Sequence, residues 1–87
     1  MVSFEIVFRS SADKDLRNLD RQNRIRVLKA IARLAQDPFP IHCRKIVGAE
    51  NDYRIRNGDY RVICEVAKVD RRVIVCYVRH RSQAYRG

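Results

Sequence analysis

The segment "YRIRNGDYRV", residues 53–62, predicts a β-hairpin from which the rest of the fold can be worked out. Asn57 and Gly58 are the turn signal, because both residues tolerate the positive φ that tight hairpin turns require. The strand after the turn, residues 60–67, and the next apolar run, residues 73–78, are rich in Val, Ile and Tyr. Both are therefore expected in the middle of a sheet.

The residues before the hairpin predict a strand followed by two helices. Apolar and polar residues alternate over residues 2–8, as in a strand with one buried face. Ser10 and Ser11 are expected to supply the N-cap of the first helix, and the second helix is expected to be capped by Asp20 and ended by Pro38. The apolar stripe of the second helix consists of Val27, Leu28, Ile31, Leu34 and Ala35.

This order of elements predicts an α+β fold. An N-terminal strand and a helical hairpin precede an antiparallel sheet of three to four strands, with residues 45–48 as a short additional strand. The helical hairpin covers one face of the sheet and leaves the other face free to bind a partner. The whole chain, residues 1–87, is expected to be a single domain.

The charge of the chain is strongly positive. It has 19 Lys and Arg against 10 Asp and Glu, a formal net charge of +9. This excess predicts a polyanionic partner, because arginine offers a planar fork of donors that matches phosphate; the alternative is a solvated surface. No apolar run reaches the ~18 residues that span a bilayer, so no membrane partner and a cytoplasmic location are expected.

The cysteines indicate reduced thiols. Cys43, Cys64 and Cys76 are an odd number without a CxxC pair, and they are expected to be mostly buried. Their spacing to His42 and His80 does not match zinc modules. Neither a metal nor a cofactor is expected.

The arginines of the hairpin predict an anion site. Arg54 and Arg56 project from the same face of a strand, about 6.6 Å apart at 3.3 Å per residue. Arg61, across the turn, lies within reach of the same pocket if the register allows it. The alternative is cross-strand pairing with Glu65 or Asp59, but repulsion among neighbouring guanidiniums favours the anion site.

The chain also resembles a known family. "YRIRNGDYRVICEV", followed by "VIVCYV" and "RHRSQAYR", resembles the C-terminal half of the RelE/ParE superfamily of bacterial toxins, and "SADKDLRNL" resembles its first helix. The likeness implies the toxin of a type II toxin-antitoxin pair, with a microbial-RNase-like fold, neutralised by an antitoxin protein that is expected to be acidic where it binds. Toxins of the RelE branch enter the ribosomal A site and cleave mRNA there. The ParE branch targets gyrase and generally lacks the full basic and tyrosine set.

The resemblance implies roles for individual side chains. Arg54 and Arg56 match positions that contact substrate phosphates, and Arg61 matches the arginine that stabilises charge at the scissile phosphate. Arg81 and Tyr85 match residues implicated in leaving-group stabilisation and in positioning the base or activating the 2′-hydroxyl.

The chain departs from the family pattern at two positions. One affects which group accepts the proton of the 2′-hydroxyl, and the other affects contact with the RNA. Arg54 stands where some relatives have Lys, and a guanidinium cannot be a general base. The 2′ proton is therefore expected on Tyr85 or His80, although Tyr85 could instead be a packing residue and His80 a surface residue. Arg79 stands where the family often has Gly, and it is expected either to contact RNA or to cap the sheet edge. His42 is interpreted as a loop residue, and core or sheet positions are expected for Tyr53, Tyr60 and Tyr77.

The sequence thus favours a metal-independent endoribonuclease that cuts mRNA in the ribosomal A site by attack of the 2′-hydroxyl. The alternatives are a gyrase inhibitor without nuclease activity and a basic RNA-binding module without catalysis.

Overall fold

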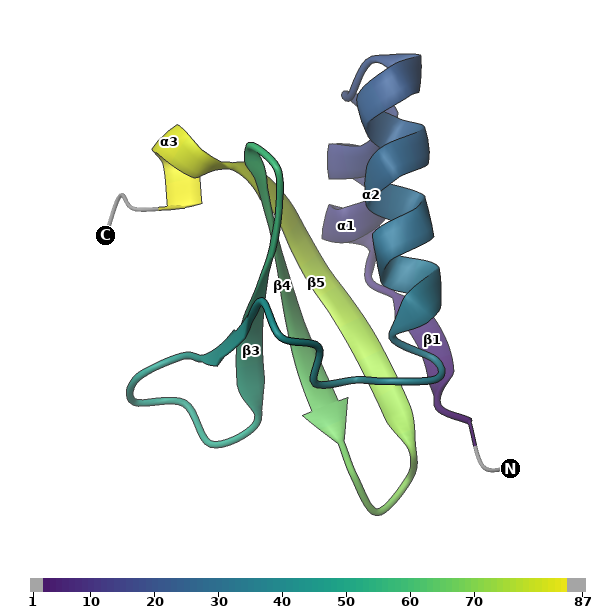
Figure 1. The fold of residues 1–87 in the computed structure, drawn as a ribbon, viewed down its shortest axis with the longest axis vertical. Coiled ribbons are helices and arrows are strands. Elements are labelled where there is room, and N and C mark those ends of the chain that lie inside the picture. Colours follow the sequence, from purple (N-terminus) through teal and green to yellow (C-terminus); the bar gives the residue numbers. More distant parts are fainter. Residues whose placement is uncertain (1–2, 85–87) are drawn as a thin grey trace.

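The computed structural model describes residues 3–84 of the chain. The elements follow one another as β1 (Glu5–Phe8), α1 (Ser10–Arg17), α2 (Arg21–Arg33), β2 (Cys43–Lys45), β3 (Asp52–Asn57), β4 (Tyr60–Ala67), β5 (Arg72–His80) and α3 (Arg81–Ala84). Figure 1 shows α1 and α2 together on one side of strands β3 to β5, with α3 on the opposite side. Over the described range, none of the helices is long and apolar enough to cross a membrane.

The described strands form one five-stranded sheet in the order β1-β5-β4-β3-β2. Strands β2 to β5 pair with one another in antiparallel fashion, whereas β1 runs parallel to β5, from Glu5 opposite Arg72 to Phe8 opposite Val75. The expected α+β fold is confirmed, and β4 and β5 are interior strands as predicted. The sheet is mixed because β1 does not pair with the strand that follows it in the chain. The α1–α2 hairpin separates β1 from the other strands in sequence, and β1 lies beside the last strand, β5, in parallel.

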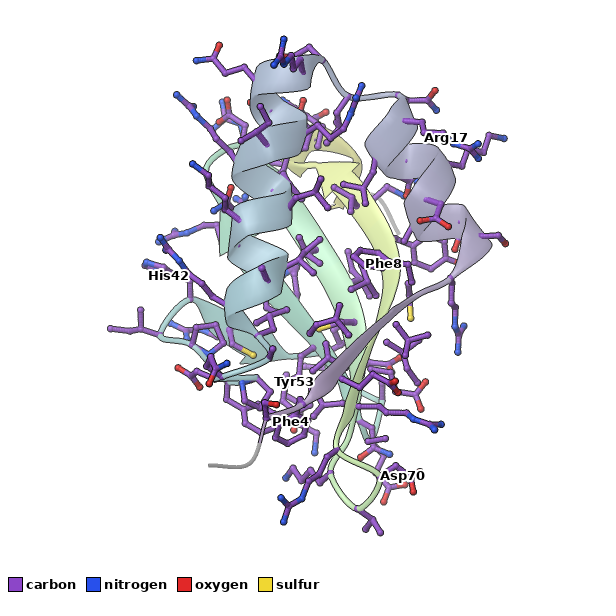
Figure 2. The ribbon with its side chains drawn as sticks, turned by 90° about the vertical axis from the view of Figure 1, so that its right-hand side faces the viewer. Phe4, Phe8, Arg17, His42, Tyr53 and Asp70 are labelled. Carbon is purple, nitrogen blue, oxygen red and sulfur yellow. The ribbon has the colours of Figure 1, made fainter. Side chains whose placement is uncertain are left out.

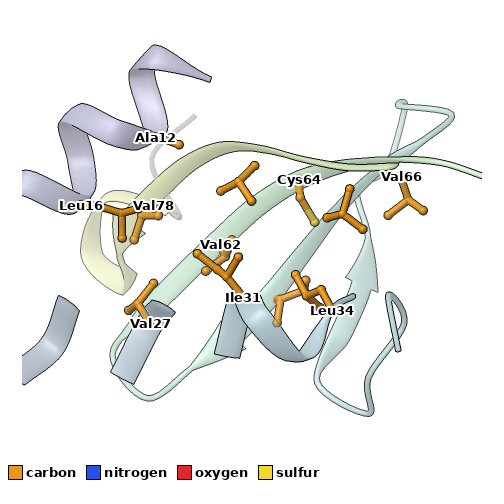
Figure 3. Packing of buried hydrophobic residues seen from close by; sticks show 12 residues of the cluster. Ala12, Leu16, Val27, Ile31, Leu34, Val62, Cys64, Val66 and Val78 are labelled. Atoms are coloured by element: carbon orange, nitrogen blue, oxygen red, sulfur yellow. The ribbon is translucent and has the colours of Figure 1, made fainter. Parts of the chain in front are cut away.

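The core lies between the sheet and the helices. One row of opposed residues crosses β2 to β5 on the covered face and consists of Cys43, Ile55, Val62 and Val78. Figure 3 shows α1 and α2 packed on this face through Ala12, Leu16, Val27, Ile31 and Leu34. Phe4 and Phe8 of the β1 segment, labelled in Figure 2, are partly buried against the same cluster. Burial of these apolar side chains is the main stabilising term of the fold.

The helices differ from the sequence expectation in detail. Leu28 is 38% exposed, because α2 meets the sheet along the line of Val27 and Ile31 and turns Leu28 away from it. Asp20 caps α2 as predicted: it accepts a hydrogen bond from the Asn23 backbone N–H at 3.3 Å. The bonds from Asn23 lower the pKa of Asp20. Ser11 does not act as expected, since its hydroxyl donates to the Cys76 carbonyl at 2.6 Å and joins α1 to β5.

The β3–β4 turn and the short strand before it are displaced from their predicted positions by one to three residues. The β3–β4 loop consists of Gly58 and Asp59, because Asn57 and Tyr60 still pair across the strands. Gly58 has φ 57°, the left-handed region that favours glycine. The short strand expected at residues 45–48 lies at Cys43–Lys45.

Candidate functional site

A basic pocket lies on the sheet face opposite α1 and α2. The cavity has a volume of about 210 Å³ and is lined by His42, Arg44, Arg54, Arg56 and Arg61. The strand register explains this grouping: Arg54 is opposed by Arg44 on β2, and Arg56 is opposed by Arg61 on β4. Opposed residues of antiparallel strands project from the same face. The structure therefore brings the hairpin arginines together, as the hairpin sequence led us to expect.

Arg61 forms the inner wall of the pocket. It is 7% exposed, and its Nη1 donates to the carbonyl oxygens of Gly58 and Tyr60, both at 3.0 Å. A buried cation held by carbonyl oxygens has little freedom to move. Arg54 is half-buried, while Arg56 is exposed at the rim. The guanidinium groups of the pocket thus range from a buried inner group to an exposed outer one.

The electrostatics of the pocket favour an anion. Neighbouring guanidiniums repel one another, and an anion placed among them relieves that repulsion. The volume of about 210 Å³ is below the ~300 Å³ at which pockets for drug-sized ligands begin. A single phosphate group with part of its sugar therefore suits this cavity better than a whole nucleotide.

His42 and Arg44 line the pocket, although the sequence reasoning assigned them no role in it. The backbone N–H of Arg56 donates to the His42 carbonyl at 3.2 Å, and the Arg56 Nη2 lies 3.4 Å from His42 Nδ1. A guanidinium can only donate, so Nδ1 accepts and the proton of the neutral ring is on Nε2. His42 and Arg44 flank Cys43, whose side chain packs on the core, so their own side chains are expected on the opposite face of the sheet. That alternation places them in the pocket only once the pairing of β2 with β3 is known. Figure 2 shows His42 at the edge of the molecule, beside the strands of that hairpin.

Arg79 shares the open face but not the pocket. It is opposed by Arg61 on β4, yet its Nη1 lies 2.9 and 3.0 Å from the two carboxylate oxygens of Asp15 on α1. Asp15 also accepts a hydrogen bond from the Val78 N–H at 3.0 Å. The Arg79 charge is therefore balanced by a carboxylate of the helical layer.

His80 projects from the other face of the sheet. It is opposed by Tyr60, whose ring it meets edge-on with centroids 5.5 Å apart. The Ser82 backbone N–H donates to His80 Nδ1 at 3.3 Å, so the proton of the neutral ring is on Nε2. His80 and Arg79 line a separate cavity of about 380 Å³. The structure does not bring His80 together with the arginine pocket.

Arg81 connects the C-terminal segment to the hairpin turn. Its backbone N–H donates to the Asp59 carbonyl at 2.7 Å, and its Nε lies 3.8 Å from the Asp59 carboxylate. The same turn accepts the hydrogen bonds of Arg61 at Gly58 and Tyr60. The start of α3 is therefore held beside the inner wall of the pocket. Tyr85 lies outside the described residues.

Burial disfavours the thiolate form of all three cysteines. All three lie within the described range as free thiols, with Cys64 and Cys76 buried. Burial raises the pKa of Cys64 to about 12 and raises the pKa values of Cys43 and Cys76. None of the three lines the arginine pocket.

Comparison with protein families gives a match to a toxin family. The sequence model described as "ParE toxin of type II toxin-antitoxin system, parDE" matches residues 6–85. A comparison with curated protein sequences found no match.

Three solved structures with the same fold come from toxin-antitoxin complexes. The RelBE2 complex of Mycobacterium tuberculosis contains a chain that is 21% identical, with a TM-score of 0.82 over 92% of this chain and 100% of that one. The archaeal RelE-RelB complex of Pyrococcus horikoshii contains one that is 26% identical, with a TM-score of 0.81 over 92% and 97%. In the RelB-RelE complex of Methanococcus jannaschii the values are 29% identity and a TM-score of 0.75, over 91% and 94%.

Proposed function

The chain belongs to the ParE toxin family of type II toxin-antitoxin systems, and from this premise we propose that it is a toxin that cleaves messenger RNA in the ribosomal A site. The observation that carries the proposal is the pocket of Arg44, Arg54, Arg56 and Arg61 on the open face of the sheet. Such a concentration of guanidinium groups suits a phosphodiester and has no evident use in a surface that contacts protein alone.

The proposed reaction needs charge stabilisation more than it needs a strong nucleophile. The 2′-oxygen attacks the adjacent phosphorus, the bond from phosphorus to the 5′-oxygen breaks, and the products carry a 2′,3′-cyclic phosphate and a 5′-hydroxyl. No metal is required in this step. Arg54 and Arg56 would bind the phosphates, and Arg61 would stabilise the negative charge that develops on the phosphorane. Because two carbonyl oxygens already hold the Arg61 guanidinium in position, its side chain would not have to change conformation to stabilise that charge.

Arg81 and Tyr85 would complete the reaction. Arg81 starts beside the β3–β4 turn, from which its guanidinium would reach the leaving 5′-oxygen. The proton of the 2′-hydroxyl would pass to the phenolate form of Tyr85, since no arginine can accept it. A proton from solvent would then convert the departing 5′-oxygen into the 5′-hydroxyl. His80 is the weaker candidate for this step, because its Nδ1 accepts from Ser82 and its ring lies on the other face of the sheet.

The proposed partners are an antitoxin and the ribosome with its message. The RelE-type chains with the same fold were solved in complexes with RelB antitoxins. A net charge of +9 would favour an antitoxin whose binding segment is acidic, because that segment would mask the charge that attracts RNA.

A gyrase inhibitor without nuclease activity is the second candidate. It is favoured by the match to the ParE toxin family model. Against it stands the basic pocket, which a protein-directed inhibitor does not need.

The two candidates are separated by mapping message 5′ ends after brief induction without the antitoxin. We expect growth arrest with new 5′ ends inside codons of translated messages. The double variant Arg61→Ala/Tyr85→Ala should lose both effects. Arrest with intact messages and DNA damage signalling would support the gyrase inhibitor instead. Neither arrest nor new ends would indicate a non-toxic RNA-binding module.

A further inference from the structure

We propose that Tyr77, with the Arg79 guanidinium packed on its ring, is a nucleobase-stacking site beside the basic pocket. The proposal deepens the proposed function and rests on it, because it assumes that the phosphate in the pocket belongs to single-stranded RNA. Tyr77 was expected in the core or within the sheet. It lies within the sheet but is 41% exposed, on the interior strand β5.

The strand register puts Tyr77 in line with the pocket. One row of opposed residues on the open face runs from β2 to β5 through Arg44, Arg54, Ile63 and Tyr77. Neighbouring strands are about 4.8 Å apart, so the main chains at Arg54 and Tyr77 are separated by about 10 Å. A nucleotide whose phosphate contacts Arg54 can therefore extend its base, or that of its neighbour, across Ile63 to the Tyr77 ring.

The ring of Tyr77 is held in place from one side. The Arg79 Cζ lies 4.7 Å from the ring centroid, and Arg79 is itself fixed by contacts of 2.9 and 3.0 Å with Asp15. Asp15 is attached to the sheet through the Val78 N–H. Tyr77 and Arg79 thus form a pre-ordered pair of flat groups, and both tyrosine rings and guanidinium planes are surfaces on which unpaired bases stack.

The chemistry around Tyr77 favours a nucleic acid over an apolar protein segment. An aromatic ring beside a groove of cations is the usual design for binding single strands, where the cations contact the backbone and the ring takes a base. The arginines Arg44, Arg54 and Arg56 lie along the same face. Charge complementarity therefore selects a polyanion as the occupant, and a protein contact becomes an outcome of the test.

The absence of tryptophan from the sequence allows a direct measurement. In Tyr77→Trp the indole would be the sole tryptophan and would report on stacking through its fluorescence. The probe is a short 2′-O-methyl oligonucleotide, which lacks the attacking hydroxyl and stays intact. We expect this probe to quench the emission of Tyr77→Trp, and an abasic oligonucleotide of equal length and inorganic phosphate to leave it unchanged. Val69→Trp is the control, since Val69 is 96% exposed in the β4–β5 turn and should not respond.

Affinities of the unlabelled variants provide the second measurement. Tyr77→Ala should bind the probe about 10-fold to 100-fold more weakly than the parent, the usual effect of removing one stacked base contact, and Tyr77→Phe should bind within about twofold. The abasic probe should bind the parent and Tyr77→Ala equally. Circular dichroism would verify that Tyr77→Ala keeps its fold.

Each remaining outcome is decisive. Equal affinity of the parent and Tyr77→Ala for the base-containing probe, with an unresponsive Tyr77→Trp, would overturn the stacking site while leaving the proposed cleavage intact. A loss of antitoxin binding in Tyr77→Ala without a loss of probe binding would identify a protein contact and would also overturn it. If the parent does not bind the probe at all, both the stacking site and the RNA-directed function fail.

Discussion

The Nη1 of Arg61 donates a hydrogen bond to the carbonyl oxygen of Gly58 at 3.0 Å, so the innermost cation of the pocket also closes the β3–β4 turn. Arg61 therefore has a structural role besides the role proposed for it in catalysis. Any loss of toxicity on its substitution must be separated from a loss of stability.

Arg61→Lys should separate these roles. Lysine keeps the charge but cannot reach the Gly58 and Tyr60 carbonyls with a planar fork, and hydrogen bonds from charged groups contribute about 1–3 kcal/mol. We expect the free energy of unfolding, measured by urea denaturation, to fall by about that amount. Arg56→Lys at the exposed rim should change it by less than about 0.5 kcal/mol. An Arg61→Lys protein as stable as the parent would refute the structural role.

Arg44 should contribute to RNA affinity through its charge. In titrations of a short single-stranded RNA, Arg44→Ala should weaken binding regardless of sequence and lower the slope of log affinity against log salt by about 0.7. The control is Lys45→Ala, which removes the same charge one residue away, from the sheet face that does not line the pocket. Equal effects of the two substitutions would indicate that net charge, and not the pocket, determines affinity.

Asp15 should be important for stability. Its carboxylate accepts from the Val78 N–H and from Arg79, and its side chain is 16% exposed. Asp15→Asn keeps the shape but removes the charge, and we expect a loss of about 1–3 kcal/mol in the free energy of unfolding. Asp13→Asn, on the exposed face of α1, should cost less than about 1 kcal/mol. Similar losses for the two variants would contradict the inferred role of Asp15.

The thiols should differ in their reactivity in the folded protein. A pKa raised to about 12 leaves almost no thiolate on Cys64 at pH 8, and Cys64 is fully buried. Iodoacetamide at that pH should therefore modify the partly exposed Cys43 well before Cys64, as followed by mass spectrometry. In denaturant the cysteines should react at similar rates. Modification of Cys64 as fast as Cys43 in the native protein would show that this part of the core opens readily.

Local patterns were sufficient to predict most of the fold. The alternation around Ile6, the Asp20 cap and the Val-rich final strands depend on neighbouring residues alone, and each prediction is confirmed. The parallel pairing of β1 with β5 and the exposure of Leu28 depend on how distant elements pack. Periodicity along the chain does not contain that information.

The site was predictable to the extent that it lies on one hairpin. Arg54, Arg56 and Arg61 are grouped by a single turn, so their meeting follows from the sequence of that turn. His42 lies in the pocket because of the β2–β3 pairing. Arg79 lies outside it because its guanidinium pairs with Asp15, 64 residues earlier in the chain. The direction of a long charged side chain depends on which distant residue it pairs with, and the strand pattern does not identify that residue.

The central claim is that this chain cleaves message on the ribosome by attack of a 2′-hydroxyl. The direct test is to add the purified chain to ribosomes programmed with a defined message and to map the product ends. The control message carries a 2′-O-methyl group at each nucleotide of the A-site codon. We predict a cut within the A-site codon that leaves a 2′,3′-cyclic phosphate and a 5′-hydroxyl, with no cut in the control message. An uncut natural message, or equal cutting of both messages, would contradict the claim.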